Sequence, residues 1–195
     1  MKILSIETSG SVCSVCLSSN KNIIAEYNIL QSFEHDRLLA LLVQRIFDDF
    51  QMKVSDIDAV AVSSGPGSFT GLRIGAALAK ALCIDNSPKL IAVPTLSAMA
   101  FSSVEFSEKY EDICCAINSH KDFVYFQKFD KNGQPLSKII FDKMDYLVEL
   151  CTKNSLLCGN GFANIGKKSL FPNGISASII NKLAVNLFET NSFIS

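Results

Sequence analysis

The spacing of apolar residues alternates between two patterns along the first half of the chain. Short apolar or alternating segments predict strands, whereas apolar residues three and four positions apart predict helices. A turn at 20–22 separates two of the expected strands, so the chain should open as an antiparallel meander. The expected elements are three strands (2–7, 12–17 and 23–29), a helix (34–51), a strand (57–62), a helix (72–84), a strand (90–93) and a helix (94–102).

The second half repeats this order in outline. The expected elements are strands at 112–118, 123–129 and 136–141, a short helix at 144–150, a strand at 155–158 and a last helix at 176–188. Three strands followed by a helix and a strand is the order of a ribonuclease-H-like lobe, and two such lobes resemble the sugar kinase–actin superfamily. We therefore predict an α/β, ribonuclease-H-like/actin-like fold with lobes at 1–104 and 105–195, the second lobe being reduced.

A glycine-rich stretch connects a predicted strand to the helix that follows it and that opens near residue 70. Pro66 fixes its own φ, and Gly65 and Gly67 are expected to take positive φ angles. The N–H groups and the positive end of a helix at such a junction can bind an anion. Gly71 and Gly75 lie four residues apart and would let another helix approach closely. The spacing fits neither a P-loop nor a dinucleotide-binding fingerprint.

The same stretch carries a resemblance to a known family. Residues 65–75, Gly-Pro-Gly-Ser-Phe-Thr-Gly-Leu-Arg-Ile-Gly, resemble the signature of the TsaB (YeaZ) family. Residues 3–9 and 13–15 are similar to the first hairpin of that family, and residues 113–118 and 124–126 are similar to its counterpart in the second lobe. The family belongs to the bacterial machinery that makes threonylcarbamoyladenosine on tRNA, so the resemblance implies a role in tRNA modification.

The resemblance implies a protein that activates a partner and has no catalytic residues of its own. The related catalytic family, TsaD, carries a His-x-x-x-His metal pair on its first helix. Here Leu39 stands four positions after His35, so that pair is broken and no metal site is expected. TsaD is implied as the heterodimer partner and TsaE as an ATPase that joins the complex, with a homodimer when TsaD is absent. Binding of tRNA is expected only through the complex, no firmly bound cofactor is expected, and ATP or ADP at the interfaces with TsaD or TsaE stays open.

The two helices at 34–51 and 72–84 form the implied partner surface. Their outer edges would meet two equivalent helices of TsaD as a four-helix bundle. The alternative is that they are ordinary helices that cover the sheet of their own lobe, and part of each must do so. The residues expected at the interface are His35, Leu38, Leu39, Leu42, Ile46, Gly71, Leu72, Arg73, Gly75, Ala76 and Ala79.

Composition narrows the classes of protein that remain. The 18 basic and 19 acidic residues form no Lys/Arg-rich run, which disfavours strong direct binding of nucleic acid. The apolar content of 48% is enough to bury a core. We see no leader and no apolar run long enough to span a bilayer, so a cytoplasmic protein is expected. The seven cysteines, an odd number within apolar segments, are expected to be buried free thiols.

The alternative function is that of an independent enzyme, an ATP-dependent phosphotransferase or a metallohydrolase. Glu7 ends the first strand at the place where kinases of the superfamily hold a metal-nucleotide. The candidates for residual nucleotide binding are Glu7, Ser9, Ser11, Gly65 and Gly67. The other interpretation of Glu7 is a strand-end carboxylate exposed to water, and we favour it slightly. The enzyme question stays open, with the non-catalytic interpretation preferred.

Overall fold

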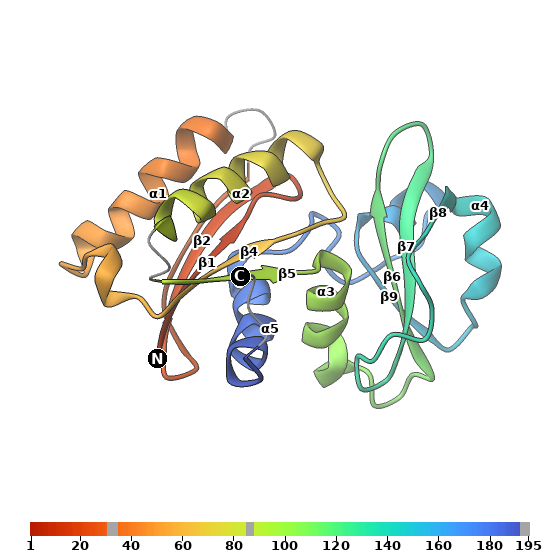
Figure 1. Ribbon diagram of the computed structural model, residues 1–195. Coiled ribbons are helices and arrows are strands. Elements are labelled where there is room, and N and C mark those ends of the chain that lie inside the picture. Colours follow the sequence, from red (N-terminus) through yellow and green to blue (C-terminus); the bar gives the residue numbers. More distant parts are fainter. Residues whose placement is uncertain (31–34, 85–87, 192–195) are drawn as a thin grey trace. The chain divides into compact units, whose positions relative to one another are not determined.

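The computed structural model describes residues 1–30, 35–84 and 88–191, and the chain divides into two compact units. Unit 1 comprises Met1–Pro94 and Ile175–Ser195, and unit 2 comprises Thr95–Gly174. Each unit contains a β-sheet with its own helices (Figure 1). Among the helices in the described ranges, none is both long and apolar enough to cross a lipid bilayer.

Unit 1 is built on a five-stranded mixed sheet with the strand order β3-β2-β1-β4-β5. The first three strands are antiparallel neighbours, since a tight turn with positive φ at Asn20 and Lys21 joins β2 to β3. β4 is parallel to β1 and β5 is parallel to β4, because a helix carries the chain back before each of them. The strands are β1 (Lys2–Glu7), β2 (Val12–Ser19), β3 (Asn22–Leu30), β4 (Ala59–Ser63) and β5 (Lys89–Val93).

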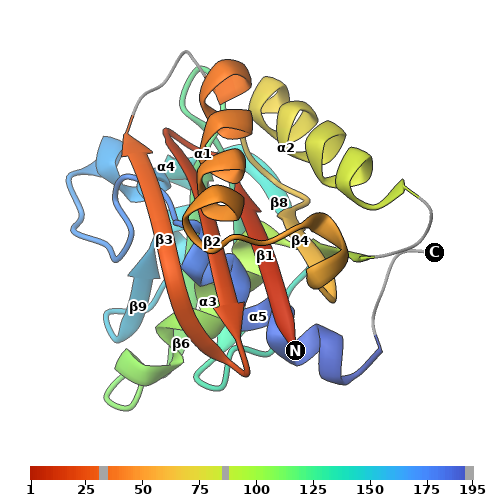
Figure 2. The ribbon, with the colours of Figure 1, turned by 90° about the vertical axis from the view of Figure 1, so that its left-hand side faces the viewer.

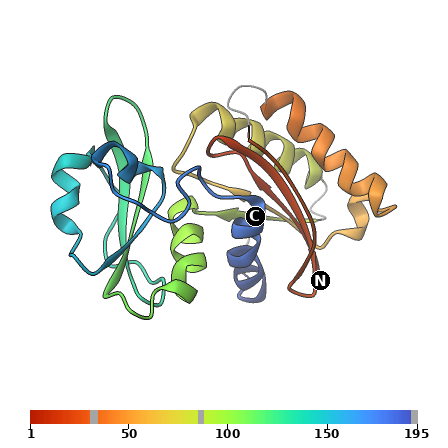
Figure 3. The same ribbon diagram turned by 180° about the vertical axis from the view of Figure 1, so that it is seen from behind.

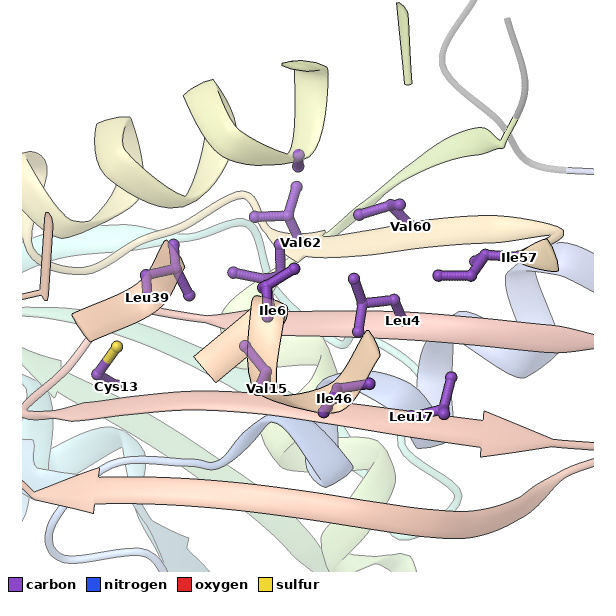
Figure 4. Close-up of a cluster of buried hydrophobic side chains, with 12 residues drawn as sticks. Leu4, Ile6, Cys13, Val15, Leu17, Leu39, Ile46, Ile57, Val60 and Val62 are labelled. Carbon is purple, nitrogen blue, oxygen red and sulfur yellow. The ribbon is translucent and has the colours of Figure 1, made fainter. Parts of the chain in front are cut away.

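Helices cover both faces of this sheet. α1 (His35–Asp49) and α2 (Phe69–Leu82) lie side by side on one face (Figure 2), and the short η1 (Val54–Asp56) leads from α1 to β4. α5 (Ala177–Glu189) packs on the other face (Figure 3). Burial of apolar side chains holds α1 on the sheet. The cluster beneath it (Figure 4) includes Leu4, Ile6, Val15, Leu17, Leu39, Ile46, Val60 and Val62.

A buried polar contact anchors α5 to the opposite face of the sheet. Asn181 donates from Nδ2 to Ser5 Oγ and to Ser18 Oγ, each at 2.9 Å, and all three side chains are buried. The start of the helix is also fixed, because the Ala177 N–H donates to Ser14 Oγ at 2.9 Å. The C-terminal helix is therefore part of the first unit, although it follows the second unit in the chain.

Unit 2 is built on a four-stranded sheet with the order β8-β7-β6-β9. β6, β7 and β8 are antiparallel, and β9 is parallel to β6. The strands are β6 (Asp112–Asn118), β7 (Phe123–Asp130), β8 (Ile140–Lys143) and β9 (Ser155–Cys158). The helical elements are α3 (Thr95–Ser103), η3 (Val104–Phe106), α4 (Met144–Leu147), η4 (Val148–Leu150) and η5 (Asn160–Ile165). α3 packs on β6, β7 and β9, whereas α4 and η5 pack together over a second apolar core.

The strand orders confirm the ribonuclease-H-like/actin-like fold. The order β8-β7-β6-β9 repeats β3-β2-β1-β4 with the same directions, and in the place of β5 the second sheet has only an isolated parallel bridge between Cys158 and Leu170. The division of the chain differs from the expected boundary after residue 104. Residues 95–103 pack as α3 on the sheet of unit 2, whereas the last helix packs on the sheet of unit 1.

Most predicted elements lie within two residues of the observed bounds, but one strand is corrected. The strand expected at 136–141 begins only at Ile140. Leu136 is apolar yet exposed, and its N–H bonds to the Lys128 carbonyl outside a regular ladder. The apolar residues of this irregular connection therefore gave a strand-like pattern although they form no strand.

Candidate functional site

The glycine loop between β4 and α2 is fastened to the turn that follows β1. Gly65 has a φ of +98°, as the sequence predicts, whereas Gly67 does not take positive φ, which corrects that expectation. Gly67 is needed for a different reason. A Cβ added to it would lie 2.6 Å from Ser9 Cβ and closer still to the Ser9 carbonyl oxygen. The Ser68 N–H donates to that oxygen at 2.7 Å, so the two loops are joined by backbone contact.

A hydrogen bond also holds the start of α2 against the end of β1. Ser68 caps the helix, because its Oγ accepts from the Gly71 N–H at 3.2 Å. Thr8 Oγ1 donates to the Gly71 carbonyl at 2.7 Å, and a Cβ added at Gly75 would lie 2.5 Å from the same Thr8 oxygen. Gly75 therefore lets α2 approach its own sheet rather than a second helix.

Glu7 is fully buried at the end of β1, which corrects the favoured interpretation of a carboxylate in water. Its Oε1 accepts from the Ser9 N–H at 2.5 Å, while Oε2 has no hydrogen-bond partner among the described residues. Burial raises the pKa of Glu7 to about 7, and contacts with Ser9 and Ser63 oppose that rise only in part. Glu7 therefore keeps its proton to a higher pH than an exposed carboxyl group does.

The predicted nucleotide-binding residues are partly brought together. Glu7, Ser9, Gly65 and Gly67 lie in the two joined loops. Two N–H groups that could bind an anion at the start of α2, those of residues 68 and 71, are instead bonded within the chain. In the part of the chain that the structure describes, three or more His, Cys, Asp or Glu side chains nowhere gather as a metal site would require.

The predicted partner surface separates into buried and accessible residues. Leu39, Ile46, Gly71, Gly75 and Ala79 are buried within unit 1, so the expectation that they face a partner is corrected. They occupy the stripes of α1 and α2 that cover the sheet. The half-buried members are Leu38, Leu42, Leu72 and Ala76, and Arg73 is exposed. The side chain of His35 lies outside the described residues.

The accessible side of the two helices carries residues that the sequence analysis missed. On α2, Ala77 and Ala81 are exposed one turn apart, in line with Arg73. On α1, Leu41 is 53% exposed. The missed signal lay in the spacing itself, because Ala77 and Ala81 repeat the four-residue interval of Gly71 and Gly75 on the opposite side of the helix.

An apolar cavity of about 380 Å³ lies beside this surface, between α2 and strands β4 and β5. Leu72, Arg73 and Ala76 contribute to its wall, so three of the predicted interface residues line it. At its edge, Phe69 is 67% exposed and the Arg73 guanidinium carbon lies 3.9 Å from the Phe69 ring centroid. This geometry is a cation–π contact, which orders the two side chains over the cavity.

Comparisons with known proteins give a consistent answer. A family model described as "TsaD: tRNA N6-adenosine threonylcarbamoyltransferase" matches residues 22–187. The tRNA threonylcarbamoyladenosine biosynthesis protein TsaB of Buchnera aphidicola subsp. Baizongia pistaciae is 31% identical over 203 residues, which cover 97% of this chain and 90% of that protein. TsaB of Escherichia coli is 33% identical over 135 residues, covering 68% of this chain and 58% of the relative, so the match spans little more than half of that protein.

A solved structure agrees at the level of the fold. YeaZ from Pseudomonas aeruginosa superposes with a TM-score of 0.84 at 19% sequence identity, covering 100% of this chain and 95% of that chain. Three observations point to the same family: the sequence of the loop at 65–75, the matching topology of the two sheets, and the sequence relatives. The chain therefore belongs to the TsaB (YeaZ) family of tRNA threonylcarbamoyladenosine biosynthesis proteins.

Proposed function

We propose that this chain is a non-catalytic subunit that pairs with a TsaD-family protein, and that the complex adds a threonylcarbamoyl group to adenosine in tRNA. The match to the TsaD family model over residues 22–187 supports pairing between related folds. Two related chains can meet about a pseudo-twofold axis, with equivalent helices of each at the centre. α1 and α2 can serve as these helices in unit 1, because they pack against each other and their outer sides are exposed.

The observation that carries the proposal is the composition of that outer side. Ala77 and Ala81 are small and exposed, which lets a partner helix approach α2 closely. Leu41 supplies an exposed apolar side chain on α1, the helix that packs against α2. Small side chains flanked by an apolar one suit a helix–helix contact.

The position of Leu39 supports the non-catalytic part of the proposal. Its side chain is buried in the apolar cluster between α1 and the sheet. A histidine there would replace an apolar core residue and would point into the unit rather than toward a substrate. We therefore expect no tRNA modification by this chain in a mixture that lacks the TsaD-family protein. Modification in that mixture, or binding of magnesium-ATP to the isolated chain by calorimetry, would favour the phosphotransferase or metallohydrolase alternative.

Association with the TsaD-family protein of the same organism tests the interface. Ala77→Arg places a long side chain on the outer side of α2 and should weaken the association about five- to a hundredfold, since overpacking a close contact costs ~1–3 kcal/mol. Ala163→Arg, at an exposed alanine of unit 2, is the matched control. Analytical ultracentrifugation gives the association constants, and thermal melts check that both variants fold. Equal association of wild type and Ala77→Arg would remove α2 from the interface.

A further inference from the structure

One face of the second sheet carries aromatic rings that the proposed pairing does not use. In the register of β7 and β8, Phe123 lies opposite Lys143 and Tyr125 lies opposite Phe141. Directly opposed residues of antiparallel strands project to the same face. The alternate residues Val124 and Phe126 project to the other face, where they belong to the apolar core of unit 2.

The rings on this face form one contiguous cluster, in which the His120–Phe123 and Phe123–Phe141 pairs are stacked and the other two pairs are tilted. The ring centroids of Phe123 and Phe141 are 5.2 Å apart with planes inclined by 25°, and those of Tyr125 and Phe141 are 4.8 Å apart. His120 extends the stack from the turn before β7, at 6.1 Å from both phenylalanines. We call these four residues the ring face. Phe141 is 45% exposed and His120 is exposed, so the stack can receive another planar group.

Two lysine side chains lie on or beside the ring face. Lys143 is exposed on the face itself, and Lys121 is exposed in the adjoining turn. Asp142 projects to the opposite side of β8, where its Oδ1 accepts from the Lys143 N–H at 2.7 Å. Asp122, in the same turn as Lys121, is adjacent in sequence to Phe123, as Asp142 is to Phe141. The two strands therefore present rings and one ammonium group, and no carboxylate, on this face.

We propose that the ring face binds unpaired bases of an RNA strand by stacking, with Lys143 and Lys121 near its phosphates. Every base has a π-face, so aromatic side chains with flanking cations bind single strands with little sequence preference. The assignment of that strand to an unpaired loop of tRNA rests on the proposed function. With 18 basic and 19 acidic residues, the whole chain provides little long-range attraction, so stacking supplies most of the affinity and the site acts as a contact within a complex.

Fluorescence anisotropy with a labelled twelve-nucleotide oligoadenylate tests the ring face in the full chain. Phe141→Leu keeps an apolar side chain but removes the ring, and it should weaken binding about five- to a hundredfold. Phe106→Leu is the matched control, because Phe106 is similarly exposed, at 51%, and belongs to no stack among the described aromatic contacts. Lys143→Gln should lower the slope of log affinity against log salt by about 0.7.

Two further probes separate stacking from charge. An abasic strand of the same length and an oligoadenylate–oligouridylate duplex should both bind more weakly than the single strand, since neither offers free base faces. Equal affinity for the abasic strand, or unchanged affinity of Phe141→Leu, would overturn the proposal. Ultracentrifugation with the TsaD-family protein distinguishes the two hypotheses. If the chain pairs with the TsaD-family protein but its RNA binding does not depend on Phe141, the proposed function stands and the RNA site is rejected. If RNA binding depends on Phe141 but the two proteins do not pair, the RNA site stands and the proposed function is rejected.

Discussion

Glu7 holds a carboxyl group away from water at the end of a central strand, and this makes the stability of the protein depend on pH. Its pKa is about 7 in the folded protein, against an ordinary value of 4.5. Between those values the folded state binds more protons than the unfolded state, so stability falls as pH rises. The difference corresponds to about 3 kcal/mol once the pH is above 7.

Glu7→Gln should therefore stabilise the protein at alkaline pH. The amide keeps an oxygen for the Ser9 N–H and carries no charge to bury. The free energy of unfolding from urea titration should exceed that of wild type by up to about 3 kcal/mol at pH 8, and the gain should shrink as the pH falls toward 4.5. Glu108→Gln, at an exposed carboxylate, is the control. A constant gain at all pH values would show that the pKa of Glu7 is the same in the folded and the unfolded protein.

Gly75 is the second residue whose role depends on its surroundings. Alanine within a helix usually gains ~1 kcal/mol over glycine, but here the new Cβ would lie 2.5 Å from Thr8 Oγ1. That oxygen cannot move freely, because it donates to the Gly71 carbonyl. Gly75→Ala should lower the free energy of unfolding by ~1–3 kcal/mol. In a Thr8→Ala background the same change should cost less, and an equal cost in both backgrounds would exclude the Thr8 contact as the cause.

The sequence could indicate these residues but not their surroundings. The four-residue spacing of Gly71 and Gly75 correctly indicates a close approach, yet spacing alone does not say whether a sheet or a partner helix approaches. The sequence suggests that Glu7 is exposed, because ionised carboxylates are seldom buried. Its burial results from the contact of two loops some sixty residues apart, which no local pattern contains.

At the scale of elements, α5 shows what a tertiary contact adds to a helix. Asn181 projects into the sheet and supplies both of its amide hydrogens to Ser5 and Ser18. Asn181→Ala should lower the free energy of unfolding by ~1–3 kcal/mol, since it leaves two buried hydroxyl groups without that donor. Asn186→Ala, at an exposed position of the same helix, is the control. Chemical denaturation measures both variants, and equal stability would mean that water replaces the amide.

Element predictions succeed where the local pattern and the tertiary environment agree. The strand at Asp112–Asn118 was predicted to the residue, because it is buried along almost its whole length and has turns at both ends. The strand before α4 was predicted too early, since Leu136 and Ile139 are apolar but exposed. The helix at the C-terminus was found, but its assignment to unit 1 was missed, because helical spacing carries no information about which sheet it covers.

The whole molecule consists of two units that are connected twice along the chain, at 94/95 and 174/175. Each unit has an apolar core of its own: Ile6 belongs to the core of unit 1, and Phe126 belongs to that of unit 2. Units with separate cores can open separately, because local unfolding follows cooperative units rather than the whole chain. We therefore expect each unit to have its own free energy of unfolding.

Native-state hydrogen exchange of two substitutions tests this expectation. Ile6→Val and Phe126→Leu should each cost ~1 kcal/mol, because each trims or reshapes a fully buried side chain. Phe126→Leu should speed exchange of the β6, β7 and β9 amides about fivefold and leave β1 and β4 protected as before, and Ile6→Val should do the reverse. If either substitution speeds exchange equally in both sheets, the units unfold as one. If each substitution speeds exchange only in its own sheet, the two units unfold separately. A destabilising substitution in unit 2 should then leave the α1–α2 surface folded for pairing, whereas one in unit 1 should impair that surface.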